Sequence, residues 1–345
     1  MNTPHTSNPR MGTHYPPGHL GLQWWQVVAA DLREVAQLIS QCEDADRALM
    51  RCESREIVDL VEISQGALQG DAIVGVDSSQ QVRAVAWVEI AEGSDGTGCA
   101  RINAFTDPAL RGRGIGRAVL KWQDQRAREL LAKCLHGNER HARVYNLVDA
   151  HVNERRRLYM AAGFSPQRTF EVLTCQLPSP ATTENEPLRT AQTNGIEILN
   201  WDPCRENEVA ELHVNVFDTA WGQRADTEQW WRRSIAAADP RWSFIATNAE
   251  NQVVGYILAS RRPAQWIGTG QADAYGELLA VSPQVRGLGA ARALLWKSMQ
   301  SAHSCGAVSF TLDVDVDNAQ GAHEFYRRMG FSAIGQQVYY ALDIS

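Results

Sequence analysis

The sequence lacks an excess of basic residues. Of its 345 residues, 33 are lysine or arginine and 40 are aspartate or glutamate, so the formal net charge is −7. Nucleic-acid-binding proteins and proteins that bind anionic membranes usually carry basic patches, so we expect neither partner. No apolar run approaches the roughly 20 residues that span a bilayer, and the N-terminus has no apolar signal region. The sequence therefore predicts a soluble, cytoplasmic protein with a disordered tail over residues 1–21.

Paired cysteines and nucleotide-loop motifs are missing as well. The seven cysteines form no C-x-x-C pair, which argues against a disulfide framework and fits a reducing compartment. Cys134 and the histidines near it match no zinc spacing, so no metal is expected. Both glycine-rich turns of the chain lack the Walker A pattern and the third glycine of a dinucleotide fingerprint. These absences exclude the two common nucleotide-binding loops.

Two sequence motifs do occur, and each occurs twice. "RGRGIGRAVL" (111–120) is repeated as "RGLGAARALL" (286–295), and "RRRLYMAAGF" (155–164) is repeated as "AHEFYRRMGF" (322–331). The motifs follow one another in the same order at nearly the same separation. This pattern indicates a duplicated domain of roughly 150 residues.

Around these motifs, helical and strand patterns alternate in the same order in both halves. The expected fold class is α/β, with two tandem copies that each have a mixed central sheet flanked by helices. We expect the first domain over 22–177 and the second over 195–345. The segment 178–194 is polar and rich in proline, which is typical of an exposed linker.

Each glycine turn opens a helix, and this suggests a site for an anion. The first N–H groups of a helix have no partner within the helix, and the helix dipole favours negative charge there. Glycine lets a ligand approach the backbone, and the leading Arg111 or Arg286 supplies a guanidinium suited to phosphate oxygens. The residues therefore point to pyrophosphate binding.

The same motifs resemble the GCN5-related N-acetyltransferase (GNAT) superfamily. The resemblance rests on R-x-x-G-x-G/A in both turns and on the later N…Y…GF segments that end in Phe164 and Phe331. It covers 22–177 and 195–344, and the tandem arrangement with "VDVDN" resembles the subgroup of mycothiol synthase. It implies splayed middle strands, acetyl-CoA as co-substrate, and direct attack of an amine on the thioester.

The resemblance also implies a set of residues that bind acetyl-CoA. In the second copy these are Leu279, Ala280, Val281, Arg286, Gly287, Leu288, Gly289, Ala290, Ala291 and Asn318. In the first copy they are Arg111, Gly112, Arg113, Gly114, Ile115 and Gly116. From the residues alone, a cap of the following helix is the favoured role of Asn318.

Two residues of the second copy are candidates for catalysis. Alternation along the strand places Asp273, Tyr275, Glu277, Leu279 and Val281 on one face. Glu277 is an acid in an otherwise apolar strand, where burial would raise its pKa toward that of a general base. The alternatives are a solvated edge glutamate or the partner of an arginine. Tyr326 is expected to protonate the departing thiolate, the alternative being a core tyrosine.

The first copy departs from this pattern. When Pro108 is aligned with Pro283, Ile102 lies opposite Glu277, and no carboxylate occupies that face of the strand. The glycine turn and Tyr159 remain. We therefore expect a scaffold or regulatory half that retains a CoA-binding loop but lacks the base.

The function predicted from the sequence is N-acetylation of a small-molecule amine by a monomer or homodimer. Two alternatives stay open: a catalytically silent CoA-binding or sensing protein, and an enzyme that acetylates protein N-termini or lysines. Asp313, Asp315 and Asp317 would attract a cationic acceptor or simply form a solvated strand end. Trp230 and Trp231 would line the acceptor pocket or pack in the core.

Overall fold

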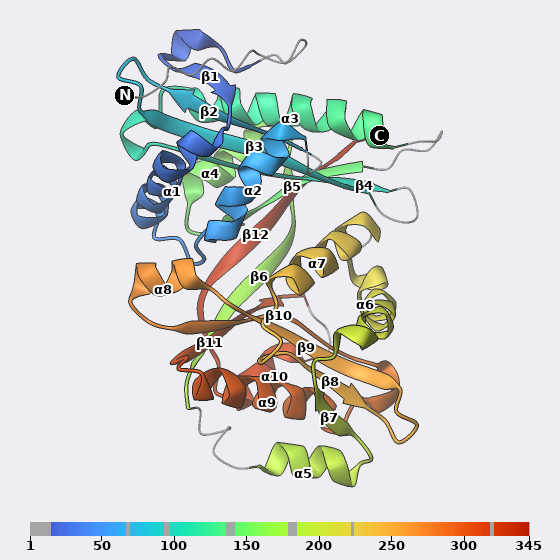
Figure 1. The fold of residues 1–345 in the computed structure, drawn as a ribbon. Coiled ribbons are helices and arrows are strands. Elements are labelled where there is room, and N and C mark those ends of the chain that lie inside the picture. Colours follow the sequence, from blue (N-terminus) through green and yellow to red (C-terminus); the bar gives the residue numbers. More distant parts are fainter. Residues whose placement is uncertain are drawn as a thin grey trace. The chain divides into compact units, whose positions relative to one another are not determined.

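The computed structural model describes residues 15–66, 70–92, 97–135, 142–178, 185–221, 224–317 and 321–344. The chain forms two compact units: unit 1 comprises Met1–Gln167 and Val338–Ser345, and unit 2 comprises Arg168–Gln337. Each unit has a mixed sheet with helices on both faces, which confirms the α/β class and the tandem copies (Figure 1). In these described ranges, no helix is both long and apolar enough to cross a membrane.

The sheet of unit 1 has the strand order β1-β2-β3-β4-β5-β12. Strands β1 to β4 pair in antiparallel fashion, and β4 pairs with β5 in parallel. Helices α1 and α2 pack on one face, and α3 and α4 pack on the other. The elements are β1 (Gln23–Gln26), α1 (Leu32–Asp46), α2 (Ser54–Gln65), β2 (Gly70–Val76), β3 (Val82–Glu92), β4 (Gly98–Thr106), α3 (Ile115–Cys134), β5 (Ala142–Asp149), α4 (Asn153–Ala161) and β12 (Ser332–Ile344).

The sheet of unit 2 has the order β6-β11-β10-β9-β8-β7. Its middle strands β10 and β11 pair in parallel, as β4 and β5 do in unit 1, and the other neighbouring strands of this order pair in antiparallel fashion. Helices α5, α9 and α10 pack on one face, and α6 and α7 pack on the other. The elements are β6 (Ser165–Gln176), α5 (Glu186–Thr193), β7 (Glu197–Asn200), α6 (Glu206–Trp221), α7 (Arg224–Ala237), β8 (Phe244–Thr247), β9 (Val253–Arg261), α8 (Pro263–Thr269), β10 (Asp273–Val281), α9 (Ala290–Ser304), β11 (Ser309–Asp315) and α10 (Ala322–Arg328).

Strand β11 shows how the sequence produces the two faces of this sheet. Its apolar residues Phe310 and Leu312 are buried in the cluster beneath α9. Successive side chains of a strand point to opposite faces, so Ser309, Thr311 and Asp313 point toward the α6 and α7 side. The two faces of unit 2 are therefore one apolar face and one that carries polar groups at its centre.

The compact units differ from the domains expected from the sequence. Most of β6, expected to close the first domain, belongs to unit 2 and pairs there with β11, and the end of β12 belongs to unit 1. The expected linker 178–194 contains α5, whose Ala191 is fully buried in the core of unit 2. The segment 178–194 is polar and contains proline, so its composition predicted a linker and did not reveal this short helix.

Candidate active site

The middle strands of unit 2 separate partway along their length. β10 pairs with β11 only from Asp273 to Gly276, although β10 continues to Val281. In unit 1, β4 likewise pairs with β5 from Gly98 to Arg101 and then continues alone. Both units therefore have the splayed middle strands that were expected, and the gap between the strands is the natural place for an extended ligand.

The edge of β10 offers backbone hydrogen bonds to this gap. Ser282 N donates to Val254 O at 2.8 Å, which fixes which residues of β10 are hydrogen bonded to β9. Alternate residues of an antiparallel pair point their N–H and C=O groups away from the partner strand. Leu279 and Val281 therefore direct these groups into the gap, whereas Ala280 directs its groups toward β9.

A β-bulge in β10 lies at Glu277. The register with β9 shifts between Gly276 and Leu278, so Glu277 is one extra residue in its strand. Bulges bend a strand and redirect a side chain, and they are frequent beside active sites. The bulge places Glu277 directly before the part of β10 that borders the gap.

The bulge overturns part of the alternation predicted for β10. Leu279 and Val281 pack in the cluster on the α9 face, whereas Leu278 packs on the α6 and α7 face. Tyr275 and Glu277 bond to groups on that second face, so they do not share a face with Leu279 and Val281. The prediction of one common face is wrong because the extra residue reverses the period-2 pattern.

Glu277 is held by two donors from the neighbouring strand and its end. Ser260 Oγ donates to Glu277 Oε1 at 2.5 Å, and Arg262 Nη2 donates to the same oxygen at 3.0 Å. The glutamate side chain is 11% exposed, so it is not a solvated edge residue. Of the two alternatives to the base role, the arginine partner is the one observed. Within the described residues, no donor reaches the other oxygen, Oε2.

Polar groups continue along the same face. Tyr275 Oη donates to Asp313 Oδ2 at 2.6 Å, and the guanidinium carbon of Arg262 lies 4.0 Å from the Tyr275 ring centroid. Burial, reinforced by Asp313, raises the pKa of Tyr275 well above its usual value. Asp273 accepts hydrogen bonds from the hydroxyls of Ser309 and Thr311, and burial raises its pKa as well.

The aspartates of β11 therefore have specific partners. Asp313 bonds to Tyr275, and Asp315 pairs with Arg168 at 2.6 Å. Asp317 donates its N–H to Asp315 Oδ1 at 3.0 Å. Asp313 and Asp315 belong to a hydrogen-bonded network, which differs from the solvated strand end that was one of the two alternatives.

Tyr326 lies on the opposite face of the sheet from Glu277. It packs against the α9 cluster with Phe325 and Phe331, at centroid distances of 5.0 and 5.7 Å. Burial raises the pKa of Tyr326 to about 12, so its hydroxyl is protonated at neutral pH but releases the proton less readily than free phenol. Groups on opposite faces of a sheet can act on one molecule only through the gap between strands.

The glycine turn of unit 2 has open space at Gly287 and is bordered by α5 at Gly289, where an added Cβ would lie 3.4 Å from Thr190. Gly287 and Gly289 have φ of +81° and +89°, and a side chain at Gly287 would meet no atom within 4 Å. Helix α9 begins at Ala290, and its N-cap Gly289 has no side chain to cap it, so the first N–H groups of the helix remain available. Arg286 is exposed, and among the described residues no carboxylate pairs with it. These features fit an anionic ligand.

The other residues expected to bind the cofactor have varied surroundings. Leu288 packs against the core, and its carbonyl accepts from Asn194 Nδ2 at 3.1 Å. Ala290 is buried, so it offers only its backbone, and Ala291 is partly exposed. Asn318 lies outside the described residues.

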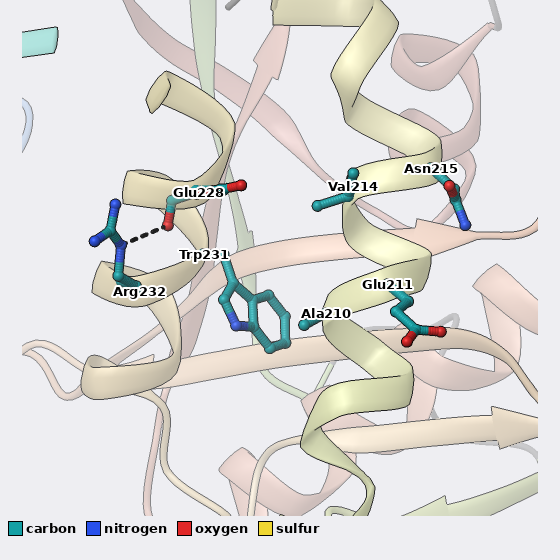
Figure 2. Close-up of a pocket in the computed structure, with 7 residues that line it drawn as sticks. All are labelled: Ala210, Glu211, Val214, Asn215, Glu228, Trp231 and Arg232. Atoms are coloured by element: carbon teal, nitrogen blue, oxygen red, sulfur yellow. Dashed lines mark hydrogen bonds between the residues drawn. The ribbon is translucent and has the colours of Figure 1, made fainter. Parts of the chain in front are cut away.

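A surface pocket of about 590 Å³ lies between α6 and α7 in unit 2 (Figure 2). The indole of Trp231 extends from α7 toward Ala210 of α6, and Val214, Glu211 and Glu228 also line the pocket. Its lining includes neither of the predicted catalytic residues and none of the residues expected to bind acetyl-CoA. Trp231 is 8% exposed and belongs to the core cluster beneath α6 and α7, and its indole also lines this pocket, so the structure fits both alternatives for this residue.

Sequence reasoning did not identify Ser260 or Arg262 as partners of Glu277. Both residues reach Glu277 because β9 pairs with β10, with Ser260 opposite Tyr275. No local motif marks either one. Their signal would be found only by working out the strand register, which depends on the bulge.

Unit 1 has no counterpart of Glu277. The register of β4 with β3 is continuous, so β4 lacks the extra residue. The side chain of Ile102 lies in the core beneath α3, the helix that follows the glycine turn of unit 1. A Cβ at Gly276 would point to Phe310, in the core beneath α9, the equivalent helix of unit 2. Ile102 therefore matches Gly276. Its alignment with Glu277 is therefore wrong. The place of Tyr275 is taken by Arg101, whose guanidinium pairs with Glu89 at 2.7 Å and Glu56 at 3.2 Å.

Comparison with known families gives the following matches. The model of the acetyltransferase (GNAT) family matches residues 206–331, which lie within unit 2. A mycothiol acetyltransferase from Rhodococcus opacus is 28% identical over 79% of this chain and 84% of its own. Another mycothiol acetyltransferase, from Rhodococcus jostii, is 30% identical over 68% of this chain and 72% of its own.

Two solved structures share the fold over nearly the whole chain. A GCN5-related N-acetyltransferase from Sphaerobacter thermophilus aligns with a TM-score of 0.66 at 21% identity, covering 93% of this chain and 95% of its own. A tandem GNAT protein of the clavulanic acid biosynthesis pathway aligns with a TM-score of 0.62 at 17% identity, covering 93% and 98%. At these identities the similarity concerns the fold.

Proposed function

Because the chain belongs to the acetyltransferase (GNAT) family, we propose that its unit 2 transfers the acetyl group of acetyl-CoA to the primary amine of a small molecule. The observation that carries this proposal is the position of Glu277. It is a largely buried carboxylate in a strand bulge, beside an open strand gap and on the same strand that leads to an uncapped glycine turn. Unit 1 lacks this combination.

The proposal assigns the cofactor site to two parts of unit 2. Arg286 and the first N–H groups of α9 hold the pyrophosphate by charge and hydrogen bonds. The edge groups of Leu279 and Val281 hold the amide-containing arm in the gap. Bound acetyl-CoA supplies the activated acyl group as a thioester.

Two side chains then move protons. Glu277 accepts a proton from the amine through its open Oε2, directly or through water, as the nitrogen attacks the thioester carbonyl carbon. Ser260 and Arg262 hold the other oxygen and fix the orientation of the carboxylate. Tyr326, protonated at neutral pH, supplies a proton to the departing thiolate from the other face of the sheet.

The proposed acceptor class rests on the relatives and on the charge of the face. Two relatives that cover most of the chain are named for mycothiol, a small molecule. The face that carries Glu277 also holds Asp273 and Asp313, and carboxylates favour a cationic ammonium group.

The test is the substitution Glu277→Gln, which keeps the size of the side chain and removes its basicity. General base catalysis contributes about 10²- to 10⁴-fold, so kcat should fall by that factor while the Kd for CoA stays unchanged. Glu250→Gln, in an exposed turn of the same unit, is the matched control and should keep full activity. Turnover is followed as free thiol released from acetyl-CoA with a panel of small amines.

The same assay separates the alternatives. Full activity of Glu277→Gln across the pH range would contradict the base assignment. CoA binding without thiol release, for any amine or peptide acceptor, would favour a sensing protein. Thiol release with lysine-containing or N-terminal peptides, and not with small amines, would favour a protein acetyltransferase.

A further inference from the structure

The gap between β4 and β5 in unit 1 is filled by the chain's own side chains. Asp107 N donates to Arg83 O at 2.8 Å, so Ala104 and Thr106 direct their backbone groups into the gap. Ala104 N donates to Asn103 Oδ1 at 2.9 Å, and Ala104 O accepts from the guanidinium of Arg155. Thr106 O accepts from Arg111 Nε at 3.4 Å.

Arg155 is the central residue of this filling. It reaches Ala104 from α4 and also donates to Asn103 Oδ1 at 3.3 Å, with its guanidinium carbon 5.4 Å from the Phe105 ring centroid. The equivalent residue of unit 2, four positions before the helix tyrosine, is Ala322, which has no polar side chain. In the described part of unit 2, no side chain bonds to the backbone of Leu279 or Val281.

The arginine that opens the glycine turn is also engaged in unit 1. Both terminal nitrogens of Arg111 donate to the carboxylate of Asp46, the last residue of α1. A bidentate pair of this kind satisfies the guanidinium that would otherwise bind phosphate. The Asp46 carboxylate also adds a negative charge where a pyrophosphate would lie.

We propose that unit 1 is closed to CoA by these internal ligands, so that the chain binds one CoA, in unit 2. The part that concerns unit 2 rests on the proposed function. Arg155 and Asn103 bond to the backbone groups of Ala104 that the arm of CoA would use, and Asp46 accepts the hydrogen bonds of the Arg111 guanidinium. Tethered groups compete at high effective concentration, so CoA would have to displace all of them at once. On this proposal, the expected second cofactor site at 111–116 does not form.

The first test is the stoichiometry of CoA binding to the full chain, measured by titration calorimetry. We expect one CoA per chain for the natural protein and none for Arg286→Glu. Two CoA per chain, or an Arg286→Glu variant whose remaining site is lost on adding Arg111→Glu, would overturn the inference while leaving the proposed function intact. No binding at all by the natural protein would overturn both.

The second test opens the closed site. In the Arg286→Glu background, which is expected to bind no CoA, Asp46→Asn combined with Arg155→Ala should create binding of one CoA per chain, with a Kd at least tenfold below the highest CoA concentration at which the background shows no binding. Arg156→Ala in the same background is the matched control, because Arg156 bonds to Tyr340 Oη and Ala150 O and does not enter the gap. A melting curve by circular dichroism confirms folding. A folded variant that gains no binding would contradict the role of Arg155 and Asp46.

Should the double substitution unfold unit 1, Arg155→Gln with Asp46→Asn serves in its place. Glutamine is shorter than arginine and leaves the Ala104 carbonyl accessible while it retains a polar side chain. The expected result and the contradicting result are the same, and the binding signal does not depend on enzyme activity.

Discussion

Strand β4 of unit 1 and strand β10 of unit 2 occupy the same place in their sheets, but β10 has a β-bulge that β4 lacks. In β10 the register with β9 shifts at Glu277, and in β4 the register with β3 is continuous. Around this difference, unit 2 keeps Tyr275, Ser260 and Arg262 beside a carboxylate with one open oxygen. Unit 1 has Arg101 between two carboxylates instead.

The comparison shows how a duplicated fold can keep its shape and change its role. Both units have splayed strands and an uncapped helix behind a glycine turn. In unit 1, side chains satisfy the free groups: Asn146 Nδ2 donates to Tyr159 Oη at 2.8 Å, whereas no partner is found for the Tyr326 hydroxyl among the described residues. We infer that unit 1 gains stability from contacts at the positions where unit 2 has its site.

The largest expected effect concerns Arg101. Replacing it with alanine leaves Glu89 and Glu56 without their buried cation, and breaking a buried pair from one side costs about 3–5 kcal/mol. The side chain of Arg101 is 12% exposed. Urea unfolding should show this loss of stability for Arg101→Ala, with kcat nearly unchanged.

The matched substitution in unit 2 is Arg262→Ala, which removes a guanidinium that is 19% exposed. Because Arg262 orients Glu277, this variant should have a lower kcat and a changed pH profile of kcat. Its free energy of unfolding should fall less than that of Arg101→Ala. Equal stability losses and unchanged kinetics in both variants would remove the distinction between the two units at this position.

The second prediction is that lowering the pH from neutral destabilises unit 2, whereas raising it from acid to neutral destabilises unit 1. In unit 2, burial lowers the pKa of His213 from 6.5 to about 4, where its ring nitrogens face Tyr256 Oη at 2.7 Å and Thr227 O at 3.1 Å. Because the pKa is lower in the folded state, neutral His213 makes its full contribution to the free energy of unfolding above pH 6.5. Roughly 3 kcal/mol of that free energy is lost as the pH falls toward 4.

In unit 1, burial raises the pKa of Glu43 from 4.5 to about 7, despite the hydrogen bond from Cys52 N at 2.6 Å. This contribution is present below pH 4.5 and is lost as pH rises through 7, by a similar amount. Urea midpoints should lose less on going from pH 6.5 down to 4 in His213→Gln than in the natural protein, and they should lose less on going from pH 4.5 up to 7 in Glu43→Gln. An unchanged pH profile in either variant would contradict its assignment.

The smallest expected effect compares the two helix tyrosines. Tyr326→Phe should reduce kcat by about 10²-fold, the lower end of the range for a lost general acid, with little change in stability. Tyr159→Phe should leave kcat unchanged and cost about 1 kcal/mol of stability, because it loses only the hydrogen bond from Asn146. Steady-state kinetics and thermal unfolding of both variants measure the difference. A tenfold or smaller loss of kcat in Tyr326→Phe would contradict its role as the acid.

Much of the architecture could be predicted from the sequence because it depends on local signals. The duplicated glycine turns predicted two copies, and each turn begins a helix at Gly114 or Gly289 with positive φ, as glycine permits. Phe310 and Leu312 show the alternation expected of a strand with one buried face. The family followed from the same motifs.

The face of Leu279 and the alignment of Ile102 could not be predicted. Period-2 reasoning assumes an unbroken ladder, and Glu277 breaks it. A bulge depends on how β10 pairs with β9, so the sequence of β10 alone does not predict it. Ser260, Arg155 and Asp46 were missed for a related reason: each acts on a residue of another element.

By itself, the sequence determined the α/β class, the two tandem copies and the glycine turns, because periodicity, turn chemistry and helix starts act over a few residues. Only the tertiary structure decided that the end of β12 belongs to unit 1, that Glu277 lies in a bulge, and that Arg155 fills the gap of unit 1. Strand register and long side-chain contacts join residues far apart in the chain. Their outcome depends on competition between packing arrangements, and a local pattern does not record which arrangement has the lower free energy.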